Sequence, residues 1–361
     1  MKIVHVVYSL EMGGAETLVA QLCRMQRANG HDVSICAYAM LGTLGEVMVA
    51  EGFRIDVLGT GPLPRSMALC LRLFLKLQPD VVHCHNPAST MQASIAARLA
   101  GASCIISTRH SLVAPPIDTT EELIYNLAAL ACDSIVGICD ATCVNLRRVP
   151  LALTDRIVRV YNGTGSIEPT QPGSSDLPPK SGFTLLFIGR LAEIKDLPTL
   201  IEAVALAVPR VPALQLWIVG NGSIRPQLEE LVVRLGLADH VTFWGERHHV
   251  APFFSTADVF TMSSVSEGLP MSLLQAMSIG LPAIVTDVGG MAEIVRNAEC
   301  GLRVPVGDAA AYADAIVQLA QNPAARESFA ANAVQAYQTD FTLEHMDAAY
   351  MDLYSRPHDV D

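Results

Sequence analysis

The chain alternates between short β-branched runs and helical patterns over most of its length, and this alternation restricts the fold more than any other feature. Strands and helices in this order are typical of a parallel sheet covered by helices on both faces. The strand-like segments of the first half are KIVHVVYSL, DVSICAY, DVVHCH, CIISTRH, SIVGIC and RIVRVYN. Helical patterns separate several of them, at residues 16–29, 66–77, 89–100 and 121–131. We therefore predict a doubly wound α/β domain in this half.

A stretch rich in Gly, Pro and Ser, from Asn162 to Gly182, interrupts the alternation and is predicted to be a linker. A second set of strands follows: FTLLFIGR, LQLWIVG, HVTFWG, DVFTMSS and PAIVTD. Its helical patterns cover residues 197–207, 224–235, 271–279 and 309–321, and a last amphipathic pattern covers 343–354. A chain of 361 residues fits two domains of roughly 150–200 residues. We predict domains at 1–165 and 183–340, a linker at 166–182 and a separate helical segment at 341–361.

Composition narrows the class of protein. The longest apolar runs are strand-sized, shorter than the ~20 residues of a membrane-spanning helix. Met1 leads directly into a strand without the pattern of a signal peptide, so we expect a cytoplasmic protein. The nine Cys form no Cys-x-x-Cys pair. His83 and His85 lie on one side of a strand, but a third metal ligand is not evident, and we predict no metal site.

The charge distribution argues against nucleic acid as a partner. The net charge is −12, and residues 1–180 carry 14 Lys and Arg against 15 Asp and Glu. Residues 181–361 carry 10 against 21. Nucleic acid requires a basic surface. An anionic partner is therefore expected only where a few cations converge.

Polar residues that follow the strands are the candidates for a site, because ligands of doubly wound sheets bind at the carboxyl ends of the strands. With two such sheets we expect the site in a cleft between the domains. In FIGRLAEIKD, Arg190 and Lys195 follow a strand and precede a helix, which suits a diphosphate. The alternative is a solvated loop in which they pair with Glu193 or Asp196.

The segment SEGLPMSLLQ begins a second helix behind an acid. Glu267 can accept hydrogen bonds from sugar hydroxyls, and residues 268–271 lead into a helix whose first N–H groups can hold a phosphate. Gln275 lies two turns further along, where a ribose would reach. The alternative for Glu267 is a capping or helix-dipole role.

In the first domain, YSLEMGGAET places Gly13 and Gly14 before a helix, where the backbone can approach a ligand closely. This is not the fingerprint of dinucleotide enzymes, and a tight turn without a ligand is the alternative. His110 ends another strand and can donate to a substrate hydroxyl or accept from it. A purely structural histidine is the alternative there.

These motifs together resemble the family 4 glycosyltransferases, retaining enzymes of the GT-B fold. The matching segments are VVYSLEMGGAET, DVVHCHN, IGRLAEIKD and SVSEGLPMSLLQAMSIGLPAIVTDVGGMAEIV, in order along nearly the whole chain. The resemblance implies two Rossmann-like domains facing a central cleft, with a nucleoside-diphosphate sugar held chiefly by the C-terminal domain. It also implies that no metal is required and that the last helix packs back on the N-terminal, acceptor-binding domain.

The resemblance also assigns expected roles. Arg190 and Lys195 look like a diphosphate clamp, Glu267 like the acid that contacts the donor sugar, and His110 like the histidine near the transferred sugar. These four are the expected catalytic residues. The expected donor-binding residues are Gly13, Gly14, Arg190, Lys195, Arg247, Gly268, Leu269, Pro270, Met271, Ser272 and Gln275. Arg247 stands where a backbone contact usually holds the base.

Two positions depart from the family pattern. Gln275 replaces the acid that usually binds the ribose hydroxyls, and YNGTGS lacks the acid that usually follows Asn-Gly. An amide oxygen still accepts from a hydroxyl, without the added strength of a charged acceptor. The first departure is expected to affect ribose binding only mildly. The second concerns the region between the domains.

The expected activity is retaining transfer of a hexosyl unit to a hydroxyl of a glycan, lipid-linked or small-molecule acceptor, in cell-surface polysaccharide or glycoconjugate biosynthesis. UDP-sugars are favoured over GDP-sugars as donor, and no cofactor is expected. The alternatives are a sugar-nucleotide 2-epimerase, a nucleotide-sugar-binding protein with weakened catalysis, and an NAD-dependent oxidoreductase, which the missing fingerprint disfavours.

A basic amphipathic helix bears on where the acceptor comes from. Arg65, Arg72 and Lys76 share one helical face, which allows weak contact with the inner face of the cytoplasmic membrane. An ordinary outer helix of the first domain is the interpretation that we favour.

Overall fold

The computed structural model describes residues 1–112, 119–147, 154–171, 174 and 178–356. The chain divides into two compact units. Unit 1 comprises Met1–Thr164 and Thr342–Asp361, and unit 2 comprises Gly165–Phe341. The predicted boundaries at 165 and 340 lie next to this division.

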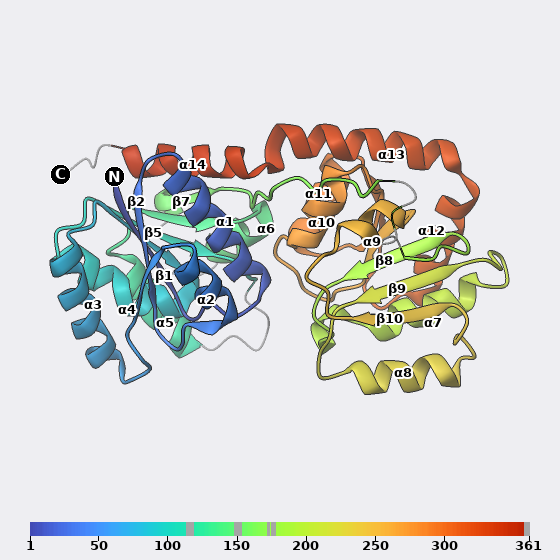
Figure 1. Ribbon diagram of the computed structural model, residues 1–361, viewed down its shortest axis with the longest axis horizontal. Helices are drawn as coiled ribbons and strands as arrows, with labels where there is room; N and C mark the ends of the chain where they lie inside the picture. The colour runs from blue at the N-terminus through green and yellow to red at the C-terminus, as the bar shows by residue number, and fades with distance from the viewer. Residues whose placement is uncertain (113–118, 148–153, 172–173, 175–177, 357–361) are drawn as a thin grey trace. The chain divides into compact units, whose positions relative to one another are not determined.

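Unit 1 is built on a seven-stranded parallel sheet in the order β3-β2-β1-β4-β5-β6-β7 (Figure 1). Its strands are β1 (Lys2–Val7), β2 (Asp32–Ala37), β3 (Arg54–Val57), β4 (Val81–His85), β5 (Cys104–Arg109), β6 (Ser134–Gly137) and β7 (Ile157–Arg159). Its helices before the crossing to unit 2 are α1 (Gly14–Ala28), α2 (Gly42–Ala50), α3 (Leu63–Leu77), α4 (Asn86–Leu99), α5 (Thr119–Ala129), α6 (Asp140–Arg147) and the short η1 (Thr154–Arg156). The predicted doubly wound α/β fold is confirmed for this unit.

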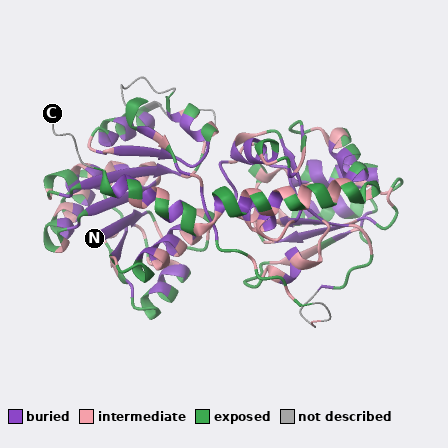
Figure 2. Cartoon of the chain, turned by 90° about the horizontal axis from the view of Figure 1, so that it is seen from above, coloured by how far each residue is buried: buried purple, intermediate pink, exposed green. Residues whose placement is uncertain are grey.

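Continuous apolar runs explain why these strands lie inside the sheet. β1 and β4 are buried along almost their whole length, as expected for parallel strands with helices on both faces. Figure 2 shows the strands inside the molecule largely in the colour of buried residues. The last helix, α14 (Leu343–Ser355), completes the cover and packs against α1. Its Tyr350 and Tyr354 are buried and hydrogen-bond to Thr108 and His83, at 3.1 and 2.7 Å. The C-terminal segment therefore belongs to the core of unit 1.

Unit 2 has a six-stranded parallel sheet in the order β10-β9-β8-β11-β12-β13. Its strands are β8 (Thr184–Ile188), β9 (Gln215–Val219), β10 (Val241–Gly245), β11 (Val259–Met262), β12 (Ala283–Thr286) and β13 (Gly301–Val304). Its helices are α7 (Leu197–Ala207), α8 (Arg225–Arg234), α9 (Ala251–Thr256), α10 (Met271–Ser278), α11 (Gly289–Asn297), α12 (Ala309–Gln321) and α13 (Pro323–Ala336), with the short η2 (Glu193–Lys195) and η3 (Tyr337–Phe341). This unit, too, is doubly wound.

The predicted linker is irregular in its described part, but it is held by unit 2. The backbone N–H of Ile167 donates to Ser278 Oγ (3.0 Å), and that of Thr170 donates to Ser255 Oγ (2.9 Å). Two helices of unit 2 therefore fix the path of the chain where it enters this unit.

The strands β3 and β13 and the helices α2, α6, α9, α11 and α13 were not predicted. β3 and β13 lie at sheet edges and are only partly buried, so their sequences lack the apolar run of the central strands. In α13 only Ala333 is buried, which leaves no apolar stripe for a periodic pattern. No helix in the described part of the chain is both long and apolar enough to cross a bilayer.

Candidate active site

The strand order of unit 2 identifies where a ligand would bind. Sequential strands run outward from β8 to β10 on one side, and β11 to β13 continue on the other, so the order reverses between β8 and β11. Ligands of open α/β sheets bind at the carboxyl ends of the strands at such a reversal. β8 leads into Arg190 and Lys195, and β11 leads into Glu267. The two predicted phosphate-binding segments therefore leave neighbouring strands.

Hydrogen bonds join these two segments. The backbone N–H of Val265 donates to the carbonyl of Ile194 (2.9 Å), and Ser263 Oγ donates to the carbonyl of Lys195 (2.8 Å). Lys195 Nζ forms an ion pair with Glu267 Oε2, and the exposed fractions of the two side chains are 16% and 18%. Lys195 thus pairs with Glu267 rather than with the predicted alternatives Glu193 or Asp196. A partly exposed pair adds little stability, so its importance lies in where it holds the two groups.

The start of α10 lies in the same segment as Glu267. Residues 268–270 are buried, and the carbonyl of Gly268 accepts from the backbone N–H of Gly290 (2.8 Å). Pro270 precedes the helix without a side-chain cap. The first N–H groups, at Met271 and Ser272, have no intrahelical partner and carry the positive end of the helix dipole, which suits an anion. Gln275 lies on the same helix and is half-buried.

Close backbone packing shapes the loop of Arg190. A Cβ on Gly220 would lie 2.0 Å from the carbonyl oxygen of Gly189, and one on Gly222 would lie 2.0 Å from that of Leu191. Only glycine fits there, and Gly220 also has a φ of 136°. These two glycines were not predicted, although their place directly after a strand was a usable signal. The Arg190 side chain itself is exposed.

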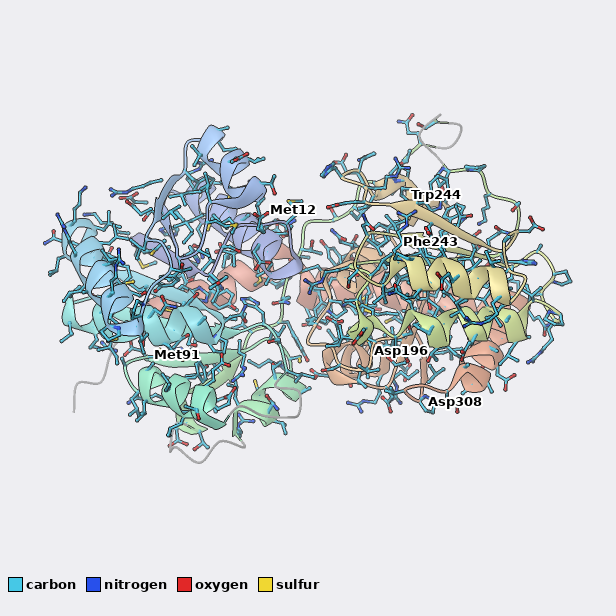
Figure 3. All side chains as sticks on the ribbon, turned by 90° about the horizontal axis from the view of Figure 1, so that it is seen from below. Met12, Met91, Asp196, Phe243, Trp244 and Asp308 are labelled. Atoms are coloured by element: carbon cyan, nitrogen blue, oxygen red, sulfur yellow. The ribbon has the colours of Figure 1, made fainter. Side chains whose placement is uncertain are left out.

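At the end of β10, the guanidinium of the exposed Arg247 donates to the carbonyl of Trp244 (3.1 Å). Trp244 lies beside Phe243 in the stick view (Figure 3) and packs edge-on against Phe253, with ring centroids 5.1 Å apart. Asp196, also labelled there, begins α7 with a φ of 45°. Apart from Gln275, which lies within α10, each predicted residue of unit 2 therefore lies on a loop or helix start that follows a strand.

Unit 1 has the same reversal, between β1 and β4. Gly13 precedes α1 in extended conformation, and its carbonyl accepts the N–H of Thr17 (2.9 Å). A Cβ on Gly14 would meet no atom within 4 Å, so the packing within unit 1 does not itself require glycine there. His110 follows β5, and its backbone N–H donates to Asn86 Oδ1 (3.0 Å).

Three buried histidines lie behind this edge of the sheet. His5 and His83 are register partners on β1 and β4, and His85 lies two residues beyond His83. Their ring nitrogens are close enough to hold a metal ion. Every one of these nitrogens, however, already has a hydrogen-bond partner. His5 bonds to His85 and Gln26, His83 to Tyr354 and Thr108, and His85 to His5 and His110. A metal ion would have to displace those bonds.

Burial keeps these imidazoles neutral. It lowers the pKa of His5 to about 4, against the weaker opposing effect of its hydrogen bond to Gln26. It also lowers the pKa of His110 to about 4. The pKa values of His83 and His85 are lowered well below the usual value by burial first and by the neighbouring histidines second.

Two family models match the chain, one in each unit. The model described as Glycosyltransferase Family 4 matches residues 12–164, and the model described as Glycosyl transferases group 1 matches residues 182–322. The EpsD protein of Bacillus subtilis, named as a glycosyltransferase, is 30% identical over 294 residues, which are 76% of this chain and 77% of EpsD.

The chain belongs to glycosyltransferase family 4. The lipopolysaccharide core biosynthesis glycosyltransferase LpsE of Rhizobium meliloti is 33% identical over 198 residues, which are 55% of this chain and 57% of LpsE. The fold of this family 4 glycosyltransferase is GT-B: the crystal structure of Anabaena HepE in complex with UDP has a TM-score of 0.86 at 19% identity and covers 98% of this chain and 100% of that chain. The predicted family and fold class are thereby confirmed.

Four polar residues near His110 were not predicted for this glycosyltransferase: His5, Gln26, His85 and Asn86. The signal was present in part, because His83 and His85 alternate on a strand and must share a face. His5 could join them only once the pairing of β1 with β4 was known. Asn86 has a φ of 68°, an uncommon conformation for a residue other than glycine, and it directs its side chain to the backbone of His110.

The missing acid after Asn-Gly has a physical counterpart. Thr164 is fully buried and pairs with Thr342, so a carboxylate at this position would lose its hydration. A Cβ on the preceding Gly163 would lie 2.2 Å from the carbonyl oxygen of Thr342. In this glycosyltransferase the segment therefore packs against the start of α14.

The basic helix, α3, packs as an ordinary outer helix. The helix packs against α4, with Leu73 buried and Leu69 and Leu77 half-buried. The exposed residues include Arg65, Arg72 and Lys76. This packing fits the interpretation favoured from the sequence. Contact of the three cations with a membrane stays a prediction.

Proposed function

We propose that this family 4 glycosyltransferase transfers a hexosyl unit from a UDP-sugar to a hydroxyl of a glycan or lipid-linked acceptor. The proposed transfer retains the anomeric configuration and needs no metal ion. The main support is the contact between the segments after β8 and β11, which holds Lys195 and Glu267 beside the start of α10. Cell-surface polysaccharide biosynthesis is the proposed process, because LpsE is named for lipopolysaccharide core biosynthesis.

In this mechanism the positive groups act on the leaving diphosphate. Negative charge develops on the diphosphate as the anomeric bond breaks, and preorganised donors that face such charge supply a large part of catalysis. Lys195, Arg190 and the first N–H groups of α10 take this role. The departing phosphate oxygen accepts the proton of the attacking hydroxyl on the face that it leaves, which gives retention.

Glu267 has a second role in the proposal. Its carboxylate accepts hydrogen bonds from hydroxyls of the donor sugar, which are charge-assisted and therefore strong. The ion pair with Lys195 and the hydrogen bond from Ser264 Oγ (3.3 Å) fix where the carboxylate points. The same contact thus aligns the sugar with the diphosphate.

Uridine is the proposed base. The crystal structures of HepE, which shares the fold, are with UDP and with UDP-glucose. Trp244 and Arg247 lie at the carboxyl end of β10, which β9 separates from β8 in the same sheet, where a base would reach if its diphosphate lies at α10.

Thermal unfolding against UDP-, GDP- and ADP-glucose tests the donor. A bound ligand raises Tm by mass action, so UDP-glucose should raise it most. Lys195→Ala should abolish this rise. Lys180→Ala is the matched control, because Lys180 pairs with Asp258 (2.8 Å) before β8 and β11, at the opposite ends of the same two strands.

Two results would contradict the proposal: no rise with any of the three nucleotide sugars, or the same loss of the rise in both lysine variants. NMR of the reaction mixture decides the chemistry. An α-linked product from an α-linked donor supports retention, whereas epimer formation without an acceptor would establish a 2-epimerase instead.

A further inference from the structure

Four side chains of unit 1 form one continuous chain of hydrogen bonds that ends at His110. Gln26 Oε1 lies 2.8 Å from His5 Nε2, His5 Nδ1 lies 3.0 Å from His85 Nε2, and His85 Nδ1 lies 3.0 Å from His110 Nε2. Gln26, His5 and His85 are at most 3% exposed. This series of hydrogen bonds therefore crosses the unit from α1 through β1 and β4 to the loop after β5.

A neutral imidazole carries one N–H and one lone pair, so the proton positions along this chain are coupled. Donation must run in one direction through all three rings. If Gln26 presents its oxygen to His5, each histidine carries its proton on Nε2. If Gln26 presents its amide N–H₂ instead, each carries it on Nδ1. The orientation of one amide decides which nitrogen of His110 holds the lone pair.

Asp347, on α14, decides the orientation of that amide. This buried carboxylate accepts from Asn29 Nδ2 at Oδ2 (2.9 Å). Among the described residues, neither Gln26 Nε2 nor Asp347 Oδ1 has a partner at full hydrogen-bond geometry, and Asp347 and Tyr354 are the two groups on which the Gln26 amide acts. Burial raises the pKa of Asp347, and hydrogen bonding from Gln26 and Asn29 lowers it in part. Because Gln26 Oε1 lies 2.8 Å from His5 Nε2, the amide nitrogen is the atom of Gln26 left for the carboxylate. An ionised carboxylate only accepts, and Gln26 Oε1 is thereby directed to His5.

The direction in which these hydrogen bonds are donated then fixes the tautomer of His110. His110 donates from Nε2 to His85, His85 donates from Nε2 to His5, and His5 donates from Nε2 to Gln26. His110 Nδ1 is left with a lone pair. This atom is buried, and it has no hydrogen-bond partner within the described ranges. An acceptor in that position suits a hydroxyl.

We propose that Asp347, Gln26, His5 and His85 are positioning residues that hold His110 in the Nε2–H tautomer, so that its Nδ1 accepts a hydrogen bond from a hydroxyl of a bound sugar. The tautomer follows from unit 1 alone, whereas the identity of the hydroxyl rests on the proposed function. The last helix of the chain thus controls, through three intervening side chains, which atom of His110 is the acceptor.

Nitrogen-15 NMR of the full chain labelled in histidine tests the tautomer directly. His110 should show a protonated Nε2 and an unprotonated Nδ1 at neutral pH, assigned by loss of its signals in His110→Asn. Asp347→Asn keeps the shape but lets Gln26 turn, so a second set of His110 signals with a protonated Nδ1 should appear. A protonated Nδ1 in the unaltered chain, or an unchanged spectrum in Asp347→Asn, would overturn the proposal.

Turnover and binding test the consequence, with UDP-glucose as donor probe and UDP as a ligand without sugar. His5→Phe should lower kcat on the order of tenfold to a hundredfold, by analogy with the loss of the hydrogen-bond partner of a metal-bound histidine. Its affinity for UDP should be unchanged. His83→Phe is the matched control. His83 is equally buried, but it bonds to Tyr354 and Thr108 and is not one of the residues that link Gln26 to His110.

Equal loss of kcat in the two phenylalanine variants, with both folded by thermal unfolding, would overturn the positioning role. If the unaltered protein binds neither UDP nor UDP-glucose, the proposed function fails, while the NMR result still decides the tautomer. The two failures are therefore distinguishable.

Discussion

The carboxyl edges of the two sheets occupy the same place in the same topology, but they carry different chemistry. In unit 1 the edge is lined by neutral imidazoles, buried and hydrogen-bonded to one another. In unit 2 it is lined by a lysine, a glutamate and an uncapped helix start. Fixed neutral acceptors suit hydroxyl groups, whereas cations and helix dipoles suit a diphosphate. The comparison teaches that the fold supplies the position, and the side chains there supply the chemistry.

The largest expected effect tests the charged edge. Lys195→Ala should lower turnover of UDP-glucose on the order of 10²–10³, as loss of one donor to a developing anion does. Release of UDP is the measurement. Lys180→Ala should retain the turnover of the unaltered protein, because its ion pair lies at the amino ends of the same strands. Comparable losses in both would mean that the two edges of the sheet do not differ in role.

Acid should destabilise unit 1 more than unit 2. Folding lowers the pKa values of His5 and His110 from 6.5 to about 4. Between these pH values the unfolded chain binds protons that the folded chain does not bind. Above pH 6.5 these two histidines therefore do not lower the free energy of unfolding. As the pH falls towards about 4, each lowers it by on the order of 3 kcal/mol. The raised pKa of Asp347 acts in the opposite sense.

Hydrogen exchange, corrected for the intrinsic effect of pH, should show that unit 1 loses protection between pH 7 and pH 5. Tryptophan fluorescence during urea unfolding reports on unit 2, since Trp217 and Trp244 both lie there. Its midpoint should change less. Equal acid sensitivity in the two units would contradict the comparison.

A substitution at Gly163 can weaken the packing of α14 without changing a residue at the carboxyl edge of either sheet. Gly163→Ala should destabilise unit 1 by about 1–3 kcal/mol, because the new methyl group would lie 2.2 Å from the backbone oxygen of Thr342. Denaturant unfolding measures the loss. At Gly165, where a Cβ would meet nothing within 4 Å, the same substitution should leave stability nearly unchanged. Equal effects would show that the packing of Gly163 is not tight.

The smallest expected effect concerns Gln275. Gln275→Glu replaces a neutral acceptor by a charged one and should raise the affinity for UDP by less than about tenfold. Titration calorimetry measures it. The gain should disappear with 2′-deoxy-UDP, which lacks the hydroxyl. A gain of equal size for both ligands would place Gln275 away from the ribose.

The sequence predicted the parts that depend on local pattern. Central strands appear as apolar runs, and Lys195 and Glu267 could be identified because each follows a strand that ends at the same sheet edge. The partner of Lys195 could not be chosen, because Glu193, Asp196 and Glu267 are all near it in a plausible fold. The hydrogen bonds from Val265 to Ile194 and from Ser263 to Lys195 bring the two segments together, and so make Glu267 the partner.

The hydrogen-bonded chain behind His110 was beyond reach for a similar reason. Its members come from positions 5, 26, 85, 110 and 347, on five different elements or loops. No periodicity links such residues, since their proximity depends on strand order and on the return of α14 to unit 1. Sequence pattern reports what each element buries, but not which buried polar groups meet.

Binding of UDP and of uridine to the unaltered chain and to Lys195→Ala tests the central claim, that Lys195 and the start of α10 hold one diphosphate. If the claim is correct, the substitution weakens UDP binding at least tenfold, roughly the strength of one charge-assisted hydrogen bond, and leaves uridine binding unchanged. Unchanged affinity for UDP, or equal weakening for both ligands, would contradict it.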